Sequence, residues 1–251
     1  LYGLWNYLTG SETSDVPIDG EMYRRLGATL EHGINCSEFL AMALPIALVW
    51  ALSERTRARR IALTLPLLLP CAAILLTYAR TGWIMLALAL AVLLWYKKKI
   101  LLLPAAALGI GALFLLPESL QARFLSMLDF SNASASGRFV LWSECFALWK
   151  DRWLLGIGLG PENFYAVYTP YATGLLDFQP PHSNMLYLEM FLSTGILGGL
   201  LFCGFFFGIF AALRRAAHAI SEPRSRWEVQ ALIASLAGAA LGGIPEYIWF
   251  Y

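Results

Sequence analysis

Four side chains of this sequence could do chemistry beside its apolar segments: Arg80, Arg138, His182 and Glu189. An arginine near hydrocarbon is costly unless it has a partner, so both cations indicate an anion-binding or ion-pairing role. An imidazole has a reference pKa of about 6.5 and can serve as a general base or acid. Glu189 lies two helical turns after His182 on the same helix face, where we expect it to pair with an arginine.

Each of these residues also has an ordinary structural interpretation. Arg80 could reach the membrane interface from a turn, and His182 could simply begin a helix. Arg138 could be a solvated charge at the start of a helix that we expect over residues 138–150. A helix N-terminus disfavours a cation, which favours a specific partner for Arg138. The residues alone leave both interpretations open.

Arg138 and His182 lie in a mostly polar interval, residues 117–184, between two strongly apolar blocks. Loops held between fixed helices commonly carry binding and catalytic residues. The Gly156-x-Gly158-x-Gly160 run in this interval resembles part of a dinucleotide-binding fingerprint. No predicted strand precedes it, however, and no βαβ unit surrounds it. We therefore interpret the run as a flexible, close-packed turn and exclude nucleotide binding there.

The composition places the chain in a membrane. Hydrophobic residues make up 59% of the sequence and charged residues 14%, against about 45–50% and about 25% in soluble domains. Because hydrocarbon cannot satisfy open backbone groups, the apolar runs must be helices, and we expect an all-α polytopic membrane protein. The net charge of +1 gives no basic excess for a nucleic-acid partner. The sequence starts without a signal peptide pattern and stops inside an apolar run, so we expect a fragment of a longer protein.

The alternation of polar and apolar sequence divides the chain into four regions. Residues 1–34 are expected to be extracytoplasmic, and residues 35–116 to hold four transmembrane helices. Residues 117–184 form the extracytoplasmic loop, and residues 185–251 hold two more helices, the last one truncated. The six expected spans cover residues 37–52, 61–78, 83–96, 100–116, 185–213 and the sequence from 227 onward.

The basic residues predict the orientation of these helices. Residues 54–60, 97–99 and 214–226 contain eleven of the eighteen lysines and arginines. They fall at alternate ends of the expected helices, so one topology places all three on the cytoplasmic side. That topology puts the 117–184 loop and the turn around Arg80 on the opposite side of the membrane. We expect the loop to fold over the outer helix ends, with Arg80, Arg138 and His182 approaching one cavity.

Four stretches, taken in order, resemble the O-antigen ligase and O-antigen polymerase family of bacterial membrane proteins. Residues 25–35 are similar to the family's Arg-x-x-Gly-Thr-x-x-x-x-Asn pattern. Residues 78–83 resemble its Ser-Arg-Gly/Thr element, with Ala79 in place of serine.

The other two stretches lie in the loop and at its end. Gly137-Arg138 with Trp142, followed by residues 153–158, is similar to the family's Gly-Arg…Trp…Pro-Leu-x-Gly-x-Gly block, with Trp153 in place of proline. Residues 182–184, followed by Gly195-Ile196-Leu197-Gly198, look like its His-Asn…Gly-x-x-Gly element with one residue inserted.

The resemblance implies a helical glycosyltransferase of the GT-C type in the bacterial cytoplasmic (inner) membrane. Such enzymes move a glycan from an undecaprenyl-diphosphate carrier to a glycan, lipid or protein acceptor at the outer, periplasmic face. The resemblance also implies an inverting reaction that needs no metal and no cofactor. The sequence has no His/Cys cluster and no Asp-x-Asp pattern that would indicate a metal site.

The resemblance assigns roles to the residues introduced above. The family's outer arginines correspond to Arg80 and Arg138, which would bind the diphosphate through their paired N–H donors. The family's loop histidine corresponds to His182, which would activate the acceptor hydroxyl or hydrogen-bond the departing phosphate. Arg24 or Arg25 is a weaker candidate for the same anion, and Glu189 would support the site.

Two other classes of protein remain open from the sequence. A polytopic transporter or flippase would also carry charged residues among its helices, but here these residues cluster at the outer face, with only Glu189 reaching inward, and the sequence indicates no paired broken helices. A non-enzymatic membrane assembly partner would use the loop as a docking surface. Loss of glycan transfer on changing one arginine, at normal protein level, would distinguish the enzyme from both.

Overall fold

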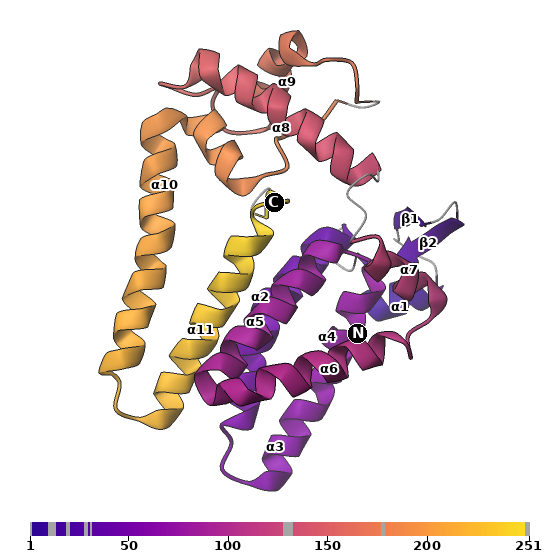
Figure 1. Cartoon of the computed structure of the whole chain (residues 1–251), viewed down its shortest axis with the longest axis vertical. Helices are drawn as coiled ribbons and strands as arrows, with labels where there is room; N and C mark the ends of the chain where they lie inside the picture. Colours follow the sequence, from indigo (N-terminus) through magenta and orange to yellow (C-terminus); the bar gives the residue numbers. More distant parts are fainter. Residues whose placement is uncertain are drawn as a thin grey trace. The chain divides into compact units, whose positions relative to one another are not determined.

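The computed structural model describes residues 2–9, 14–18, 21–27, 30, 32–127, 133–176 and 179–248, and these residues are almost entirely helical (Figure 1). They form two compact units. Unit 1 comprises residues 1–128 and 213–242, and unit 2 comprises residues 129–212 and 243–251. The expected all-α polytopic class is confirmed; a short antiparallel hairpin is the strand structure found in the described residues.

Unit 1 contains the N-terminal hairpin and most of the helices. Its elements are α1 (Tyr2–Thr9), β1 (Ser14–Ile18), β2 (Glu21–Arg25), α2 (Gly33–Leu52), α3 (Arg57–Thr64), η2 (Leu65–Leu67), α4 (Leu68–Leu76), α5 (Arg80–Lys98), η3 (Lys99–Leu101), α6 (Leu102–Leu113), α7 (Glu118–Leu125) and α11 (Pro223–Gly242). The hairpin pairs Asp15 with Arg24 and Ser14 with Arg25.

Helices α2, α5 and α11 pack together and form the centre of unit 1. Small residues let their backbones approach closely, as is common between membrane helices. A Cβ placed on Gly238 of α11 would lie 2.8 Å from the carbonyl oxygen of Met85 in α5. The hydroxyl of Ser235 donates to the carbonyl oxygen of Met42 in α2 at 2.8 Å. The buried side chains between the three helices are Val49, Ala89, Leu93, Ala231 and Ala234.

Three helical stretches in the described residues are long and apolar enough to cross a membrane: α2, the α3–α4 run over Arg57–Leu76, and α10 (Leu186–Ala219). A span needs about 20 residues, because each adds about 1.5 Å to a hydrocarbon core of about 30 Å. The span expected over residues 100–116 is represented by α6, which has 12 residues. The apolar runs therefore predicted the positions of these helices better than their lengths.

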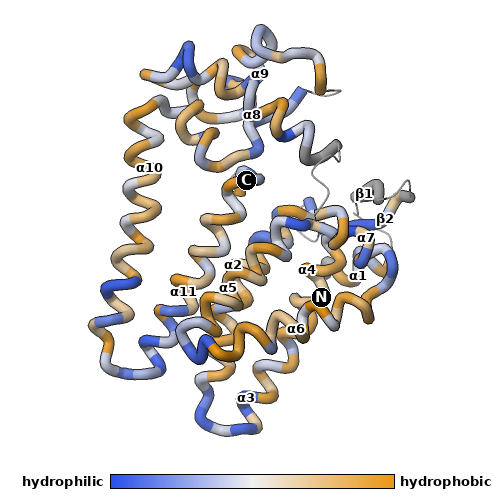
Figure 2. Tube along the Cα trace, in the orientation of Figure 1, coloured by the Kyte–Doolittle hydropathy of each residue, from blue (hydrophilic) through white to orange (hydrophobic). Residues whose placement is uncertain are grey.

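Two contacts bring the three basic turns to one end of unit 1. The guanidinium of Arg224 lies 3.8 Å from the carboxylate of Glu54, which joins the start of α11 to the turn between α2 and α3. The ammonium of Lys97, at the end of α5, lies 3.8 Å from the ring centroid of Trp227. Figure 2 shows the hydrophilic residues of these turns in blue. Such clustering suits the topology predicted from the basic residues.

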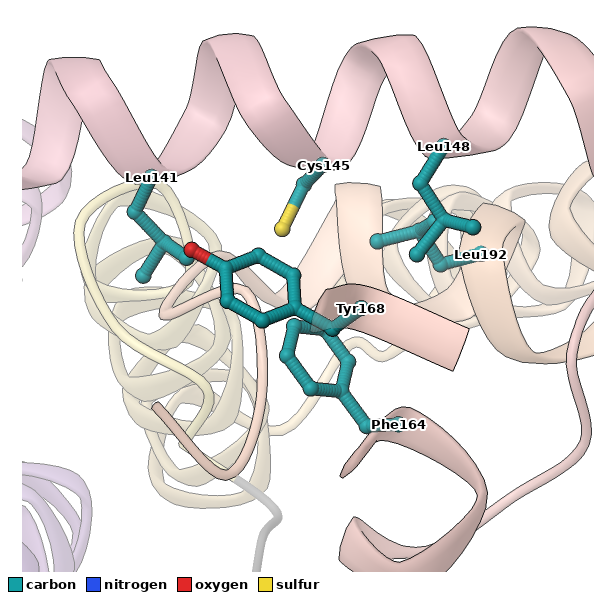
Figure 3. Packing of buried hydrophobic residues seen from close by; sticks show 6 residues of the cluster. All are labelled: Leu141, Cys145, Leu148, Phe164, Tyr168 and Leu192. Carbon is teal, nitrogen blue, oxygen red and sulfur yellow. The ribbon is translucent and has the colours of Figure 1, made fainter. Parts of the chain in front are cut away.

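Unit 2 is built on the long loop of the sequence. It contains α8 (Ala133–Arg152), α9 (Pro161–Tyr168), η4 (Thr169–Tyr171) and the larger part of α10. Leucines of α8 and α10 pack with aromatic rings of α9, and the Phe164 and Tyr168 rings stack with centroids 4.9 Å apart (Figure 3). The buried residues of this core are Leu141, Cys145, Leu148, Phe164, Tyr168 and Leu192. The loop is therefore a folded unit with its own core.

The glycine-rich turn closes on a break in α10. Helical geometry stops at Gly195, whose φ of 67° suits glycine, and this break frees the carbonyl groups of the preceding turn. The N–H groups of Ile157 and Gly158 donate to the carbonyls of Leu192 and Ser193 at 2.8 and 2.9 Å. A Cβ on Gly156 would lie 2.6 Å from backbone atoms of this segment. The turn is close-packed, as predicted, because it caps a broken helix.

Several helix ends differ from the expected ones. Arg80 was expected in a turn but is the first residue of α5, and Arg138 is the sixth residue of α8 instead of the first. The helix-dipole argument for Arg138 is therefore wrong, since the dipole acts within the first turn. The final helix was expected to continue to the end of the sequence, but α11 ends at Gly242. Gly243 and Pro245 follow it, and both residue types end helices.

Candidate functional site

Arg80 is held in unit 1 by a reciprocal pair of hydrogen bonds. Its Nη1 donates to the carbonyl oxygen of Ser126 at 3.1 Å, at the end of α7. Arg123, on α7, donates from Nε to the carbonyl oxygen of Tyr78 at 3.1 Å, in the turn before α5. The rings of Trp83 and Phe124 stack between the same two helices with centroids 4.2 Å apart. Two guanidinium groups are thus fixed where α7 meets the start of α5.

A third arginine contacts the same turn from the hairpin. Arg25 donates from Nε to the carbonyl oxygen of Thr77 at 2.7 Å. Arg24, its neighbour on β2, donates instead to the carbonyl oxygen of Tyr7 in α1 at 3.1 Å. Of the two weaker candidates, Arg25 is therefore the one that contacts the turn before Arg80. Arg123 was not identified by sequence reasoning. No local sequence pattern indicates that this arginine contacts a turn 45 residues earlier in the chain.

Arg138 of unit 2 forms an ion pair with Glu246. The glutamate is buried, with 8% of its surface exposed, and lies in the turn after α11. The same turn is held by the N–H of Leu186, at the start of α10, which donates to the carbonyls of Gly243 and Glu246. A charge pair with little solvent access fixes the direction of the guanidinium. Glu246 is therefore a positioning residue for Arg138, which sequence reasoning did not identify.

His182 lies against the residue that follows Glu246. Its ring packs edge-on against Tyr247, with centroids 5.4 Å apart. Its Nδ1 accepts a hydrogen bond from the backbone N–H of Asn184 at 3.1 Å. Burial lowers the pKa of His182 to about 4, so the ring is neutral at physiological pH. Since Nδ1 accepts, the neutral ring carries its proton on Nε2 and presents a hydrogen-bond donor.

Glu189 does not pair with an arginine in the described part of the chain, and that prediction is wrong. Its carboxylate accepts hydrogen bonds from the backbone N–H of Ser183 at 2.8 Å and from the hydroxyl of Ser193 at 3.2 Å. Ser183 follows His182 directly, so Glu189 fixes the backbone beside the histidine. The partners of Glu189 are serines because the chain folds back on the start of α10, and the supporting role of Glu189 stays a prediction.

Another buried carboxylate, Glu144 of α8, lies beside a cavity of about 300 Å³. It accepts hydrogen bonds from the Tyr168 hydroxyl and from the N–H and hydroxyl of Thr173, the last two at 2.6 and 2.5 Å. Burial alone would raise the pKa of this carboxyl, but these hydrogen bonds outweigh it and lower the pKa. The remaining cavity residues carry no charge: Thr169, Ala172, Gly174, Leu176 and Gln179. This chemistry suits neutral hydroxyl groups better than phosphate.

The structure thus brings together some of the predicted residues. In unit 2, Arg138 and His182 contact adjacent residues, Glu246 and Tyr247, with Glu189 beside them. In unit 1, Arg25 and Arg123 donate to the carbonyls of Thr77 and Tyr78, in the turn directly before Arg80. The expectation that Arg80 approaches the same cavity as Arg138 and His182 stays a prediction.

One comparison with known proteins bears on these residues. The family model described as O-antigen ligase matches residues 65–203, which is more than half of the chain and includes Arg80, Arg138 and His182. No curated protein matches the chain.

Proposed function

Because this chain belongs to the O-antigen ligase family, we propose that it transfers a glycan from an undecaprenyl-diphosphate carrier to an acceptor at the outer face of the bacterial cytoplasmic membrane. Membership of the family places the protein in surface polysaccharide biosynthesis, as a membrane protein that acts on a lipid-linked glycan and an acceptor. The carrier, the GT-C type of fold, the orientation and the inverting, metal-independent course belong to our proposal. The observation that carries it is that the family match includes all three proposed site residues.

The reaction that we propose needs cations more than a strong nucleophile. The acceptor hydroxyl attacks the anomeric carbon of the donor, the bond from that carbon to the diphosphate oxygen breaks, and the diphosphate leaves on its lipid. Negative charge grows on the departing oxygen, so fixed donors aimed at it lower the barrier. We assign this role to Arg80 and Arg138, with Arg25 as an additional cation.

We propose that His182 donates a hydrogen bond from Nε2 to the departing phosphate. Of the two roles that the sequence left open, the tautomer set by Asn184 supports this one, since a general base needs a ring nitrogen with an available lone pair. The acceptor proton would then leave to a phosphate oxygen of the departing diphosphate. The uncharged cavity beside Glu144 would hold a sugar ring of the glycan.

Glu246 offers a test of the positioning of Arg138. Glu246→Gln should lower kcat roughly 10- to 100-fold with little change in protein level, because a misdirected guanidinium stabilises the departing charge poorly. The change should add little to the loss caused by Arg138→Ala, since the two residues act as one group. Glu162→Gln, an exposed residue of α9, is the control. Equal losses in both glutamate variants, or fully additive losses with Arg138→Ala, would contradict this role.

Deletion of the gene in the source cell tests the proposed function. We expect lipid-linked glycan to accumulate at the outer face of the membrane, and complementation with the wild-type gene to restore its transfer. Capped single repeats would identify the acceptor as another repeat, and unattached polymer would identify it as a lipid. An unglycosylated protein would identify the acceptor as that protein. Accumulation at the cytoplasmic face would instead indicate a flippase and overturn the proposal.

A further inference from the structure

A second charged cavity lies in unit 1, at the end where the basic turns meet. Its volume is about 260 Å³, and it lies between the end of α5, the end of α10 and the start of α11. The residues that line it are Tyr96, Arg214, Ala217, His218, Arg226 and Gln230. Two guanidinium groups, an imidazole, an amide and a phenol converge here without a carboxylate. These groups are hydrogen-bond donors suited to an anion with several oxygens.

The acidic residues near this cavity are engaged elsewhere. Glu228 and Glu54 both face Arg224, at 3.1 and 3.8 Å, and Glu222 accepts from the Ser225 hydroxyl at 2.5 Å. Within the described residues no ion pair involves Arg214 or Arg226. Arg226 donates from Nε to the carbonyl oxygen of Ile220 at 2.9 Å, which fixes its side chain toward the turn. The cavity therefore has a positive charge that the neighbouring carboxylates do not neutralise.

The surroundings of the cavity are those of a membrane surface. It forms where the long apolar helix α10 ends in charged residues. Trp95, directly before Tyr96, exposes 63% of its surface, and Ile100 exposes 70%. An exposed tryptophan beside lysines is typical of the boundary between hydrocarbon and headgroups. A ligand here would therefore join an anionic group to an apolar part.

We propose that this cavity binds the phosphate of an anionic phospholipid headgroup. Arg214 and Arg226 provide the charge, and Gln230 and Tyr96 provide neutral donors for the remaining oxygens. Basic pockets between membrane helices bind such headgroups on the side of the membrane that carries the basic turns. None of the residues assigned to transfer lines this cavity, so we expect a lipid bound here to stabilise the helix ends without taking part in the reaction.

The test uses adjacent arginines as a matched pair. The purified protein is titrated with dioctanoyl phosphatidylglycerol, dioctanoyl phosphatidylcholine or inorganic phosphate, and the increase in Tm gives the apparent affinity. Phosphatidylglycerol should stabilise the wild type most. Arg214→Gln and Arg226→Gln should each weaken its apparent affinity roughly tenfold or more, the loss expected for a charge-assisted hydrogen bond. Arg215→Gln, which removes the same charge outside the cavity, should stay within about twofold of the wild type.

Three outcomes would overturn the proposal. Equal weakening by Arg214→Gln and Arg215→Gln would show diffuse attraction to a basic surface. Stabilisation by inorganic phosphate equal to that by phosphatidylglycerol would identify a soluble anion as the ligand. Equal stabilisation by phosphatidylcholine would show that the headgroup charge is not recognised.

Discussion

Arg80→Lys is expected to lower glycan transfer roughly 10²–10³-fold, nearly as far as Arg80→Ala. A guanidinium presents two parallel N–H donors to a diphosphate, whereas an ammonium presents a point charge, so lysine keeps the charge and loses the geometry. We expect the same order of loss for Arg138→Lys. Transfer is measured with purified protein, lipid-linked donor and acceptor, alongside the amount of monodisperse protein recovered from detergent.

Arg59→Lys is the matched control for these variants. Arg59 is exposed near the start of α3, among the basic residues, and its change should leave transfer within about twofold of the wild type. A near-normal rate for Arg80→Ala would show that Arg80 has only a structural role. If the transfer by Arg80→Lys decreased only in proportion to the amount of folded protein, the conclusion would be the same.

His182→Gln should retain much more transfer than His182→Ala. The glutamine amide can still donate to a phosphate oxygen, whereas alanine removes the donor and should cost roughly 10²–10³-fold. If His182 were a general base, both variants would lose roughly 10²–10⁴-fold, since an amide cannot take a proton. Side-by-side rates of the two variants, at equal amounts of folded protein, separate these roles.

The pH dependence gives a second measure of the same residue. Burial lowers the pKa of His182 to about 4, against about 6.5 in the unfolded chain. The unfolded state therefore binds the proton first, and the stability contributed by the neutral ring is complete above pH 6.5 and lost as the pH falls toward 4. The rate of transfer by the folded protein should therefore show no decrease with a midpoint near pH 6.5 as the pH is lowered. Such a midpoint, absent in His182→Gln, would contradict the donor role.

Much of the fold could be predicted from the sequence, because membrane helices depend on local composition. The apolar runs and the basic turns located most of the helices, and the glycine spacing predicted a close-packed turn. The break of α10 at Gly195 could not be predicted, since the carbonyl groups that it frees accept hydrogen bonds from the N–H groups of Ile157 and Gly158, nearly forty residues earlier in the chain. A helical pattern does not show which carbonyl groups another segment will cap.

The candidate site was predicted in part, for a related reason. Arg80, Arg138 and His182 stand out because they interrupt a pattern or match a family motif. Glu246 interrupts no sequence pattern and matches no family motif, and its pairing with Arg138 joins residues 108 positions apart. Glu189 was assigned the wrong partner, because two serines brought together by the local fold satisfy its carboxylate. Partners of this kind follow from the packing of distant segments, which composition and spacing do not determine.

The most direct test of the central claim is transfer by the purified full-length protein in excess EDTA. The protein is supplied with glycan on undecaprenyl diphosphate and with acceptor, and both the joined glycan and the released undecaprenyl diphosphate are measured. We predict that the wild type forms both products in equal amounts, that EDTA leaves the rate unchanged, and that Arg80→Lys shows the roughly 10²–10³-fold lower rate given above. Loss of transfer in EDTA, or an Arg80→Lys rate equal to that of the wild type, would contradict the proposal that fixed arginines, and not a metal ion, supply the positive charge that stabilises the departing diphosphate.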